Sequence, residues 1–379
     1  MAFALTKAPT ADEMISEKGY LASFWRNVFN KAKERQASDI HVESLKSGLQ
    51  IRFRINGVLC LPFGTIADRG EAVQLVDKLK EIANLDTSTK RVLQDTSFNL
   101  DLTDSTYRVS LSPGFLYGEC AVLRIINNDD PPHLEKIEFT AQAKEDLKWA
   151  IQQRQGLFLV TGPTGSGKST TLQACIAAID FQGRKIISIE NPPERILPGV
   201  VHEQITKDYT WTDAIKGAMR EDPNVILVGE VRDRESAKLA VEAAQTGHLV
   251  LTTLHTNNVA ATVNRLITLG IEKHLIADSL LFISAQRLLK KLCPCKKAAG
   301  DFFERSKNGC PSCQFTGFSG RIPILEYCLQ PDPSLIYQFD HKAFEKILRQ
   351  TLDSETRRLV ALGLVDHRVL LSAAPGATS

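Results

Sequence analysis

The sequence predicts an α/β protein in which a smaller α+β domain precedes a mostly parallel sheet that carries a cysteine-clipped subdomain. Three observations predict this. From about residue 140, short apolar runs alternate with helical stretches, as in parallel strands joined by helices. The run GPTGSGKST directly follows the apolar stretch 157–161, which is the order of a strand, a phosphate-binding loop and a helix. Half of the eight cysteines lie within residues 293–313.

Length and composition limit the class of protein. At 379 residues the chain is longer than the stretch that usually folds around a single hydrophobic core, which predicts two or more domains. Its net charge of +2 is too balanced to indicate nucleic-acid binding from bulk charge. The first residues lack the apolar core of a signal peptide, and no run reaches the ~18 apolar residues of a membrane span. These features predict a cytoplasmic protein, where thiols stay reduced and disulfides are rare.

The first part of the chain predicts an α+β domain over residues 19–127, after a poorly ordered leader over 1–18. Residues 19–36 place Leu21, Trp25 and Phe29 at helical spacing. Alternating patterns then predict strands, with one helix over 71–84 between them; the strands fall at 39–45, 49–56, 57–63, 97–102, 107–113 and 119–126. Charge, Asn and paired prolines predict a linker over 128–139.

The second domain, residues 140–379, predicts a buried parallel sheet with helices on both faces. Its apolar, β-branched runs are 157–161, 185–190, 224–230 and 248–254. The most apolar stretch, 274–292, is interrupted by Asp278, Gln286 and Arg287 and is interpreted as an amphipathic core helix. The tail after residue 371 is rich in small residues.

The glycine loop matches G-x-x-x-x-G-K-[ST], and the flanking strand and helix argue against a chance match. Backbone amides and a helix N-terminus offer positive partial charge to phosphates. Lys168 is expected to reach the β- and γ-phosphates of ATP, and the Ser169 hydroxyl to bind Mg²⁺. The residues predicted to bind nucleotide here are Gly162, Thr164, Gly165, Ser166, Gly167, Lys168, Ser169 and Thr170.

Two glutamates end predicted parallel strands, where active sites collect. Glu230 could orient or deprotonate the attacking water; the alternative is an ion pair with Arg232. Glu190 could polarise water or hold a Mg²⁺-bound water; the alternative is a cap or loop carboxylate. Both are candidates for catalysis.

Two histidines bracket the run HLVLTTLH. Their spacing of seven places His248 and His255 on opposite faces of an ideal strand. His255 follows the productive end of the strand and is expected to sense the γ-phosphate, with a structural role as the alternative. For His248, nucleotide binding and a structural role stay equally open.

The cysteine cluster predicts a zinc site within a subdomain over 289–321. Structural zinc prefers tetrahedral thiolates paired on tight turns, and Cys293, Cys295, Cys310 and Cys313 form two such pairs. Pro294, Pro311 and Gly309 favour the turns. The alternatives are unrelated free cysteines or a redox pair, which lacks its usual context.

Four further stretches resemble one family. ASDIHVE (37–43), ISIENPPE (187–194), MREDPNVILVGEVRD (219–233) and AAQTGHLVLTTLHTN (243–257) resemble the hallmark boxes of the secretion ATPase superfamily of type II secretion and type IV pilus assembly. With the glycine loop they span residues from about 20 to 330. The departures are Asn191 and Asn224, where the family usually has Asp, and a loop one residue longer before Arg124.

The resemblance implies a fold and a set of roles. It implies an N-terminal domain joined flexibly to a RecA-like ATPase domain, a homo-hexameric ring, and nucleotide bound between the domains. Glu230 would be the catalytic glutamate, assisted by Glu190. Arg108 and Arg124 match family positions whose arginines neutralise charge on the nucleotide; from the residues alone both could be surface arginines. Asp39, His41 and Glu43 share one strand face, and packing is favoured over a metal site.

The resemblance also implies a cellular role. The chain would drive pilin or pseudopilin movement through an inner-membrane platform protein, lying peripherally at the inner membrane through its partners and without binding nucleic acid directly. The cysteine cluster is typical of the assembly and export branch, although the chain length suggests the retraction branch. A retraction motor, a nucleic-acid translocase and a nucleotide-gated scaffold are the alternatives. No basic stripe with aromatics supports a translocase, and Lys168 with Glu230 argues against a scaffold.

Overall fold

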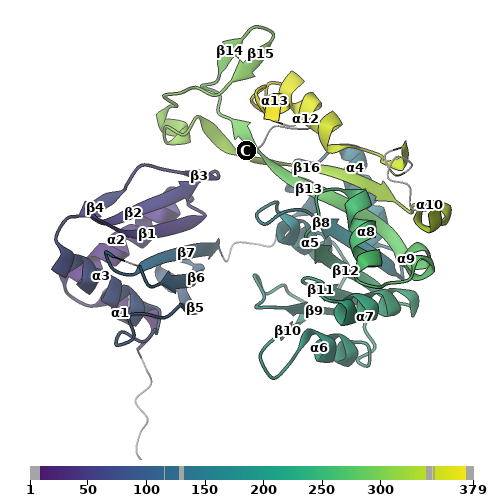
Figure 1. Ribbon diagram of the computed structural model, residues 1–379, viewed down its shortest axis with the longest axis horizontal. Coiled ribbons are helices and arrows are strands. Elements are labelled where there is room, and N and C mark those ends of the chain that lie inside the picture. The colour runs from purple at the N-terminus through teal and green to yellow at the C-terminus, as the bar shows by residue number, and fades with distance from the viewer. Residues whose placement is uncertain (1–8, 115, 128–131, 339–343, 345, 373–379) are drawn as a thin grey trace, which may run out of the picture. The chain divides into compact units, whose positions relative to one another are not determined.

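The computed structural model describes residues 9–114, 116–127, 132–338, 344 and 346–372 (Figure 1). The chain forms two compact units. The N-terminal unit comprises Met1–Asp129, Cys293–Lys296 and Arg305–Gly320, and the second comprises Asp130–Leu292, Lys297–Glu304 and Arg321–Ser379. The cysteine-bearing segments thus group with the N-terminal unit, although the sequence predicted them as part of the ATPase domain. Part of the predicted linker, 128–131, lies outside the described residues.

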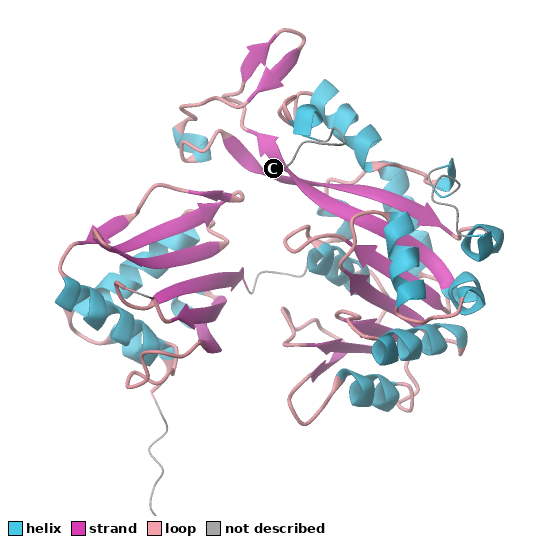
Figure 2. Ribbon diagram, viewed as in Figure 1, coloured by secondary structure: helices cyan, strands magenta, loops and turns pink. Residues whose placement is uncertain are grey.

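The N-terminal unit is built on a seven-stranded antiparallel sheet of order β3-β2-β1-β7-β6-β5, with β4 also paired to β2 (Figure 2). Its strands are β1 Asp39–Leu45, β2 Gly48–Ile55, β3 Val58–Leu59, β4 Gly64–Ile66, β5 Gln94–Leu100, β6 Ser105–Ser112 and β7 Cys120–Asn127. The predicted strand over 57–63 is reduced to the two residues of β3.

Three helices complete this unit: α1 Ala11–Ser16, α2 Tyr20–Glu34 and α3 Arg69–Ile82. Helix α2 confirms the predicted apolar face, since Trp25, Val28 and Phe29 are fully buried. The Trp25 indole donates a hydrogen bond to the Leu75 carbonyl on α3 (2.8 Å). These side chains pack against alternate strand residues such as Ile40, so one face of the sheet is apolar.

The prediction of a poorly ordered leader is wrong for residues 11–16. Thr10 and Glu13 form a reciprocal capping box at the start of α1, which satisfies amides that a helix start otherwise leaves unpaired. Ile15 is 1% exposed within the core, so burial anchors the helix. The remainder of the predicted leader before residue 9 lies outside the described residues.

The second unit contains a seven-stranded sheet of order β10-β9-β11-β12-β8-β13-β16. The pairs from β10 through to β13 are parallel, as predicted. The strands are β8 Gly156–Thr161, β9 Ile186–Glu190, β10 Val200–Gln204, β11 Val225–Val228, β12 Leu249–Leu254, β13 Leu280–Leu292 and β16 Phe318–Leu329. A separate hairpin joins β14 Lys297–Ala299 to β15 Phe302–Glu304.

Helices cover both faces of this sheet. They are α4 Ala141–Ile151, α5 Lys168–Ala177, α6 Trp211–Ala218, α7 Arg234–Gln245, α8 Val259–Thr268, α9 Lys273–Ser279, α10 Pro333–Gln338, α12 Leu352–Ala361 and α13 Val369–Ser372. Strand β8 shows the two layers. Leu157 and Leu159 belong to one hydrophobic cluster, and Phe158 and Val160 to another. None of the described helices has the length and apolarity needed to cross a bilayer.

The predicted core helix over 274–292 is wrong for most of its length. Only α9 is helical, and residues from Leu280 to Leu292 form β13. The strand lies between β8 and β16, and its first seven residues are all buried. A strand buried on both faces shows no alternation of polar and apolar residues, so its pattern cannot be told from that of a buried helix. Strands β10 and β16 were not predicted.

A buried ion pair in the N-terminal unit provides a test of its packing. Lys80 Nζ lies 2.6 Å from Glu119 Oε1, with side chains 0% and 7% exposed. Glu119→Ala should lower the free energy of unfolding by about 3–5 kcal/mol, because it leaves a buried ammonium without its partner. The double variant Lys80→Met/Glu119→Leu should recover most of this loss. Urea unfolding measures both, with Lys31→Ala in an exposed pair as control. Equal losses in single and double variants would contradict this role of the pair.

Candidate active site and metal centre

The glycine loop forms a tight turn between β8 and α5. Gly167 caps the helix with φ of 89°, and Gly162 has φ of 145°, conformations that favour glycine. A Cβ atom at Gly162 would lie 2.5 Å from the Gln286 carbonyl oxygen, and one at Gly167 would lie 2.8 Å from Gln286 Nε2. The loop therefore needs glycine at both positions to approach β13 this closely.

Lys168 lies at the first position of α5 and is 8% exposed. Its Nζ donates to the carbonyls of Gly162 (2.9 Å) and Pro163 (3.1 Å), which leaves the third ammonium proton for a further acceptor. Burial lowers the pKa of Lys168, against the opposing influence of Glu230. The Ser166 hydroxyl is buried without a partner among the described residues. This loop offers donors to an anion, which fits a phosphate.

Strand register brings the other candidates to the loop's edge of the sheet. In the parallel pair β8 and β12, Thr161 is opposite Leu254, so the glycine loop and His255 begin side by side. Val228 of β11 is opposite Ile189 of β9, which places Glu230 and Glu190 at neighbouring strand ends. Ligands in parallel α/β sheets bind at this carboxyl edge.

Glu230 is the centre of a charged cluster. Its Oε1 lies 2.5 Å from Arg232 Nη2, so the ion pair considered as the alternative does form. Its other oxygen lies 3.9 Å from His255 Nε2. The side chain is 21% exposed. The Glu230 carboxylate is therefore paired with Arg232 and also lies beside His255, which is itself a candidate site residue.

The His255 side chain is half exposed and lies close to Glu230 and to the positive charges of Lys168 and Arg232. Partial burial lowers its pKa, and the positive charges of Lys168 and Arg232 add to this effect while Glu230 opposes it. Because the ordinary histidine pKa is about 6.5, the ring is mainly neutral at pH 7. A neutral ring can both donate and accept a proton in hydrogen bonds.

Glu190 ends β9 and is mostly buried. Ser188 Oγ donates to Glu190 Oε1 (2.7 Å). His202 Nδ1 lies 3.9 Å from the same oxygen, and burial lowers the pKa of His202. The glutamate is thus positioned by its own strand and by β10.

His248 lies at the other end of β12. Its carbonyl accepts a hydrogen bond from the Gly156 amide at the start of β8, and its Nδ1 lies 3.0 Å from the Ala243 carbonyl oxygen. The whole strand separates it from the glycine loop in the same chain. The structure therefore does not bring His248 to the predicted nucleotide site.

Gln286 is a site residue that the sequence interpretation missed. It is 1% exposed on β13, donates from Nε2 to the Ser166 carbonyl (2.8 Å) and accepts from Thr171 Oγ1 (2.8 Å). It thereby fastens both the glycine loop and the first turn of α5 to the sheet. A polar residue inside a long apolar run was the available signal, but the sequence interpretation took it only as an interruption of an amphipathic core helix.

The two candidate arginines lie together in the N-terminal unit. Arg108 on β6 is directly opposite Arg124 on β7, and directly paired residues of antiparallel strands share a face. Arg124 Nε also lies 3.5 Å from Asp39 Oδ1. The structure thus groups these arginines as one cationic patch.

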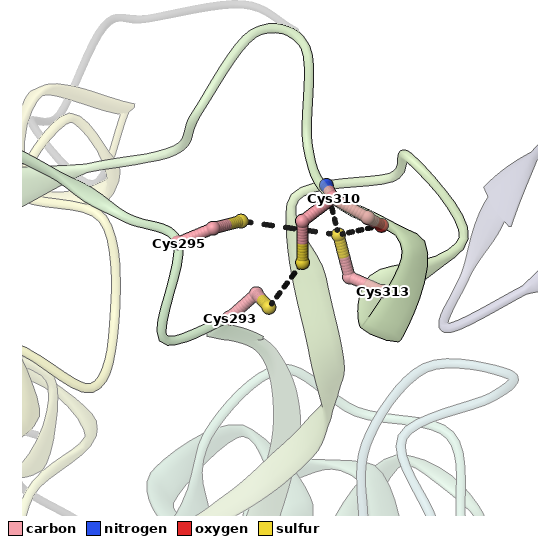
Figure 3. A group of neighbouring side chains, drawn as sticks. All are labelled: Cys293, Cys295, Cys310 and Cys313. Atoms are coloured by element: carbon pink, nitrogen blue, oxygen red, sulfur yellow. Dashed lines mark hydrogen bonds between the residues drawn. The ribbon is translucent and has the colours of Figure 1, made fainter.

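The four cysteine sulfurs converge (Figure 3). All lie within 4.8 Å of one another; Cys293 and Cys310 sulfurs are 3.7 Å apart, and those of Cys295 and Cys313 are 3.9 Å apart. These separations are too long for disulfide bonds. A tetrahedral ion with metal–sulfur distances of about 2.3 Å would separate its sulfurs by about 3.8 Å. The cluster therefore fits a metal ion bound by four thiolates.

Backbone amides favour a thiolate in this cluster. Burial raises the pKa of Cys313, but the amides of Cys310 (3.1 Å) and Gly317 (3.2 Å) donate to its sulfur and bring the pKa down to about 6. Gly309 has φ of 59°, and a Cβ there would lie 2.5 Å from the Phe315 backbone. The tight turn therefore depends on this glycine, as the sequence predicted.

The segment between the cysteine pairs is a hairpin, not a structureless loop. Strands β14 and β15 pair antiparallel. Phe302 stacks on His367 at 5.9 Å between ring centroids, and the His367 amide donates to the Phe303 carbonyl (3.2 Å).

Within the described residues, the four cysteines are the one group of three or more His, Cys, Asp or Glu side chains that a single metal ion could join. This finding disfavours the alternative metal site at Asp39, His41 and Glu43.

The fold and the glycine loop define a P-loop nucleotide-binding protein with a RecA-like domain. The chain belongs to the family of type II/IV secretion system proteins, whose model matches residues 15–370. This confirms the resemblance inferred from the sequence.

Individual relatives come from the secretion and the pilus branches. The chain is 38% identical to the type II secretion system ATPase E of Vibrio cholerae over 86% of this chain and 69% of that protein. It is 37% identical to the type IV pilus assembly ATPase PilB of Myxococcus xanthus over 78% of this chain and 56% of that protein. The crystal structure of the pilus retraction motor PilT with bound ADP matches at a TM-score of 0.66 and 26% identity, over 92% of this chain and 96% of that chain.

Proposed function

We propose that this chain is a homo-hexameric ATPase that drives type IV pilus assembly or type II secretion from the cytoplasmic side of the inner membrane, through an inner-membrane platform protein. The convergence of Lys168, Glu230 and His255 beside one glycine loop carries the proposal. The names of the relatives support the choice of process, since they include a secretion ATPase and a pilus assembly ATPase.

The geometry suggests how the residues divide the work. Loop amides and Lys168 bind the phosphates of ATP. The Ser169 hydroxyl, one residue further into α5, would hold a Mg²⁺ ion that offsets phosphate charge. Glu230 accepts or orients the proton of the attacking water, and Arg232 contacts its carboxylate. Neutral His255 can bind a phosphoryl oxygen as a donor, and Glu190 supports the water.

Arg108 and Arg124 complete the proposed site. A guanidinium group pairs well with phosphoryl oxygens because its planar fork matches their spacing. Charge that develops on the transferred phosphoryl group is stabilised by such groups in other P-loop enzymes. These arginines belong to the N-terminal unit and the glycine loop to the second.

The cysteine cluster favours assembly or secretion over retraction. We propose that it binds one zinc ion, since four thiolates at these separations suit Zn²⁺. The ion would clip the segment between Cys293 and Cys313. Retraction is the second candidate, because the fold also matches a retraction motor. A DNA-stimulated ATPase assay separates both from a nucleic-acid translocase, whose activity would rise with DNA.

The roles of Glu230 and Lys168 can be separated by mutation. Glu230→Gln should bind ATP with near-normal affinity but hydrolyse it at least ~100-fold more slowly, because the carboxylate acts on water. Lys168→Ala should lose much of the binding itself. Steady-state turnover and equilibrium binding of a fluorescent ATP analogue measure the two effects. Glu235→Gln, an exposed α7 carboxylate, is the matched control. A Glu230→Gln variant with normal kcat would show that the catalytic assignment is wrong.

Removing the N-terminal arginine tests the proposed contribution of that unit. Arg108→Ala should lower kcat by ~10-fold or more, since arginines on transferred phosphoryl groups contribute 10³–10⁵-fold elsewhere. The thermal unfolding midpoint should stay close to that of the unchanged chain. Arg91→Ala, at an exposed position of the same unit, should keep full activity. Equal kcat/KM in Arg108→Ala and the unchanged chain would remove Arg108 from the site.

Metal content tests the cysteine cluster. One zinc ion per chain should copurify, and Cys310→Ser should lose it and lower the thermal midpoint, because structural zinc contributes on the order of 10 kcal/mol to folding. ATP affinity should be unchanged. Native mass spectrometry and thermal unfolding measure these effects, with Cys60→Ser outside the cluster as control. Metal-free protein with unchanged stability would refute the zinc site.

A further inference from the structure

A serine and a histidine interrupt one apolar face of the parallel sheet beside Glu190. Strand register places His202 of β10 opposite Ser188 of β9, and residues side by side in a pleated sheet project to the same face. Glu190 lies two residues after Ser188 on β9, so it projects to that face as well. Ile186, two residues before Ser188, packs in the hydrophobic cluster that contains Ile176 of α5. The three polar side chains therefore lie on the face that packs against the helix after the glycine loop.

One hydrogen bond decides which ring nitrogen of His202 carries the proton. The Leu197 amide donates to His202 Nε2 (3.0 Å), so this nitrogen accepts and has no hydrogen of its own. Burial lowers the pKa of His202 below the ordinary histidine value of about 6.5, and the ring is mainly neutral at pH 7. A neutral imidazole carries one N–H group, which must therefore be at Nδ1.

The nitrogen that carries the proton lies beside Glu190. His202 Nδ1 is 3.9 Å from Glu190 Oε1, and the two side chains are 9% and 12% exposed. Within the part of the chain that the structure describes, Nδ1 is buried and has no hydrogen-bond partner. The separation is longer than a hydrogen bond, but hydrogen bonds that support catalysis often shorten only when substrate binds. His202 thus holds a donor within a short movement of the carboxylate.

The same carboxylate oxygen already has one fixed donor. Ser188 Oγ donates to Glu190 Oε1 (2.7 Å), and Ser188 is 1% exposed. The Ile205 amide donates to the Glu190 carbonyl (2.9 Å), which ties the ends of β9 and β10 together. Two donors that approach one oxygen from two strands favour a single orientation of the carboxylate.

The other ring nitrogen of His202 holds the loop between β9 and β10. Within residues 191–199, all of which the structure describes, Leu197 is the one buried residue. Its carbonyl accepts from the Val200 amide (3.3 Å), and its amide donates to His202. A buried amide needs an acceptor, and His202 provides it. The histidine therefore anchors this loop at its one buried residue.

The anchored loop carries a charge that acts on the glycine loop. Burial lowers the pKa of Lys168, the charge of Glu230 opposes this effect most strongly, and the charge of Glu194 also opposes it. Glu194 belongs to loop 191–199. The position of this loop thus contributes to the balance of charge around the lysine of the glycine loop.

A purely structural role does not account for the ring. A main-chain carbonyl would accept from the Leu197 amide without burying a second N–H group. A buried N–H group without an acceptor is unfavourable, and the one on His202 lies beside the carboxylate of a proposed catalytic residue. A donor that engages Glu190 during turnover explains why it is there.

We propose that His202 is a positioning residue that anchors loop 191–199 through Nε2 and orients Glu190 through the proton on Nδ1. This proposal rests on the proposed ATPase function, in which Glu190 supports the attacking water. His202 does not contact ATP or the water; it acts through Glu190 and through the loop.

Two amide side chains separate the roles of the two ring nitrogens. His202→Gln can place its amide oxygen where Nε2 lies, so it keeps an acceptor for Leu197 and loses the donor beside Glu190. It should lower kcat by ~3- to 10-fold, less than the 10²–10⁴-fold of a general base itself. His202→Asn is shorter and can place its amide nitrogen near Nδ1. It should keep kcat within ~2-fold and speed hydrogen exchange of the Leu197 amide by ~10-fold or more, because local opening exposes that amide.

A mutant cycle shows whether Nδ1 acts through Glu190. In a chain that carries Glu190→Gln, the further change His202→Gln should alter kcat by less than ~2-fold, because residues that act through one another are not additive. His274→Gln, at an exposed histidine of α9, is the matched control and should leave both kcat and Leu197 exchange unchanged. Thermal midpoints check folding throughout.

The ring can also be observed in the unchanged chain, which keeps the test decisive if a variant does not fold. The ¹⁵N chemical shifts of His202 at neutral pH should show a protonated Nδ1 and an unprotonated Nε2. The Leu197 amide should exchange more slowly than that of Ile196, which is exposed. A protonated Nε2 would overturn the proposal.

The outcomes distinguish the positioning role from the ATPase function on which it rests. If Glu190→Gln is impaired while His202→Gln matches His274→Gln, the positioning role is wrong and the ATPase function stands. The positioning role is also wrong if His202→Gln lowers kcat equally with and without Glu190→Gln, or if Leu197 exchanges equally fast in His202→Asn and the unchanged chain. A fully active Glu190→Gln overturns both the assisting role of Glu190 and its orientation by His202. If the unchanged chain does not hydrolyse ATP, the proposed function itself fails, and the ring shifts and Leu197 exchange still decide whether His202 anchors the loop.

Discussion

The parallel register of β8, β12, β11 and β9 is the constraint on which the rest of the second unit depends. Because Thr161 is opposite Leu254 and Val228 is opposite Ile189, the residues that follow these strands meet at one edge. Parallel strands require crossover helices, so residues far apart in sequence arrive at the same place. A shift of one strand by two residues would separate Glu230 from the glycine loop while leaving the core equally apolar.

Strand β13 connects this edge to the cysteine cluster along the chain. Its first half is buried and supplies Gln286, which holds the glycine loop by one hydrogen bond and the first turn of α5 by another. Its last residue, Leu292, directly precedes Cys293. A buried amide whose oxygen and nitrogen are both paired is a rigid attachment. The strand therefore serves two purposes: it completes the sheet beside the glycine loop and it leads into the turn that presents the first cysteine pair.

The N-terminal sheet divides its two faces between folding and charge. Its apolar face packs on α2 and α3, with Trp25 and Phe29 fully buried. Its other face gathers Arg54, Asp39 and Arg124 in one cross-strand row. Antiparallel pairing makes both faces possible at once, because alternate residues of each strand point in opposite directions. The same strands thus build an apolar core on one face and carry a row of charged side chains on the other.

The sequence by itself determined the glycine loop, the acidic strand ends, the cysteine pairs and most strands, because each is a local pattern of a few residues. It also determined the family, through five separate stretches. Tertiary structure alone decided that residues 280–292 form a strand, since only neighbours on both sides distinguish a buried strand from a buried helix. It placed His248 away from the glycine loop, and it joined Asp39 to Arg54 and Arg124, which lie 15 and 85 residues away. Strand pairing sets such contacts, and no local pattern records which strands will pair.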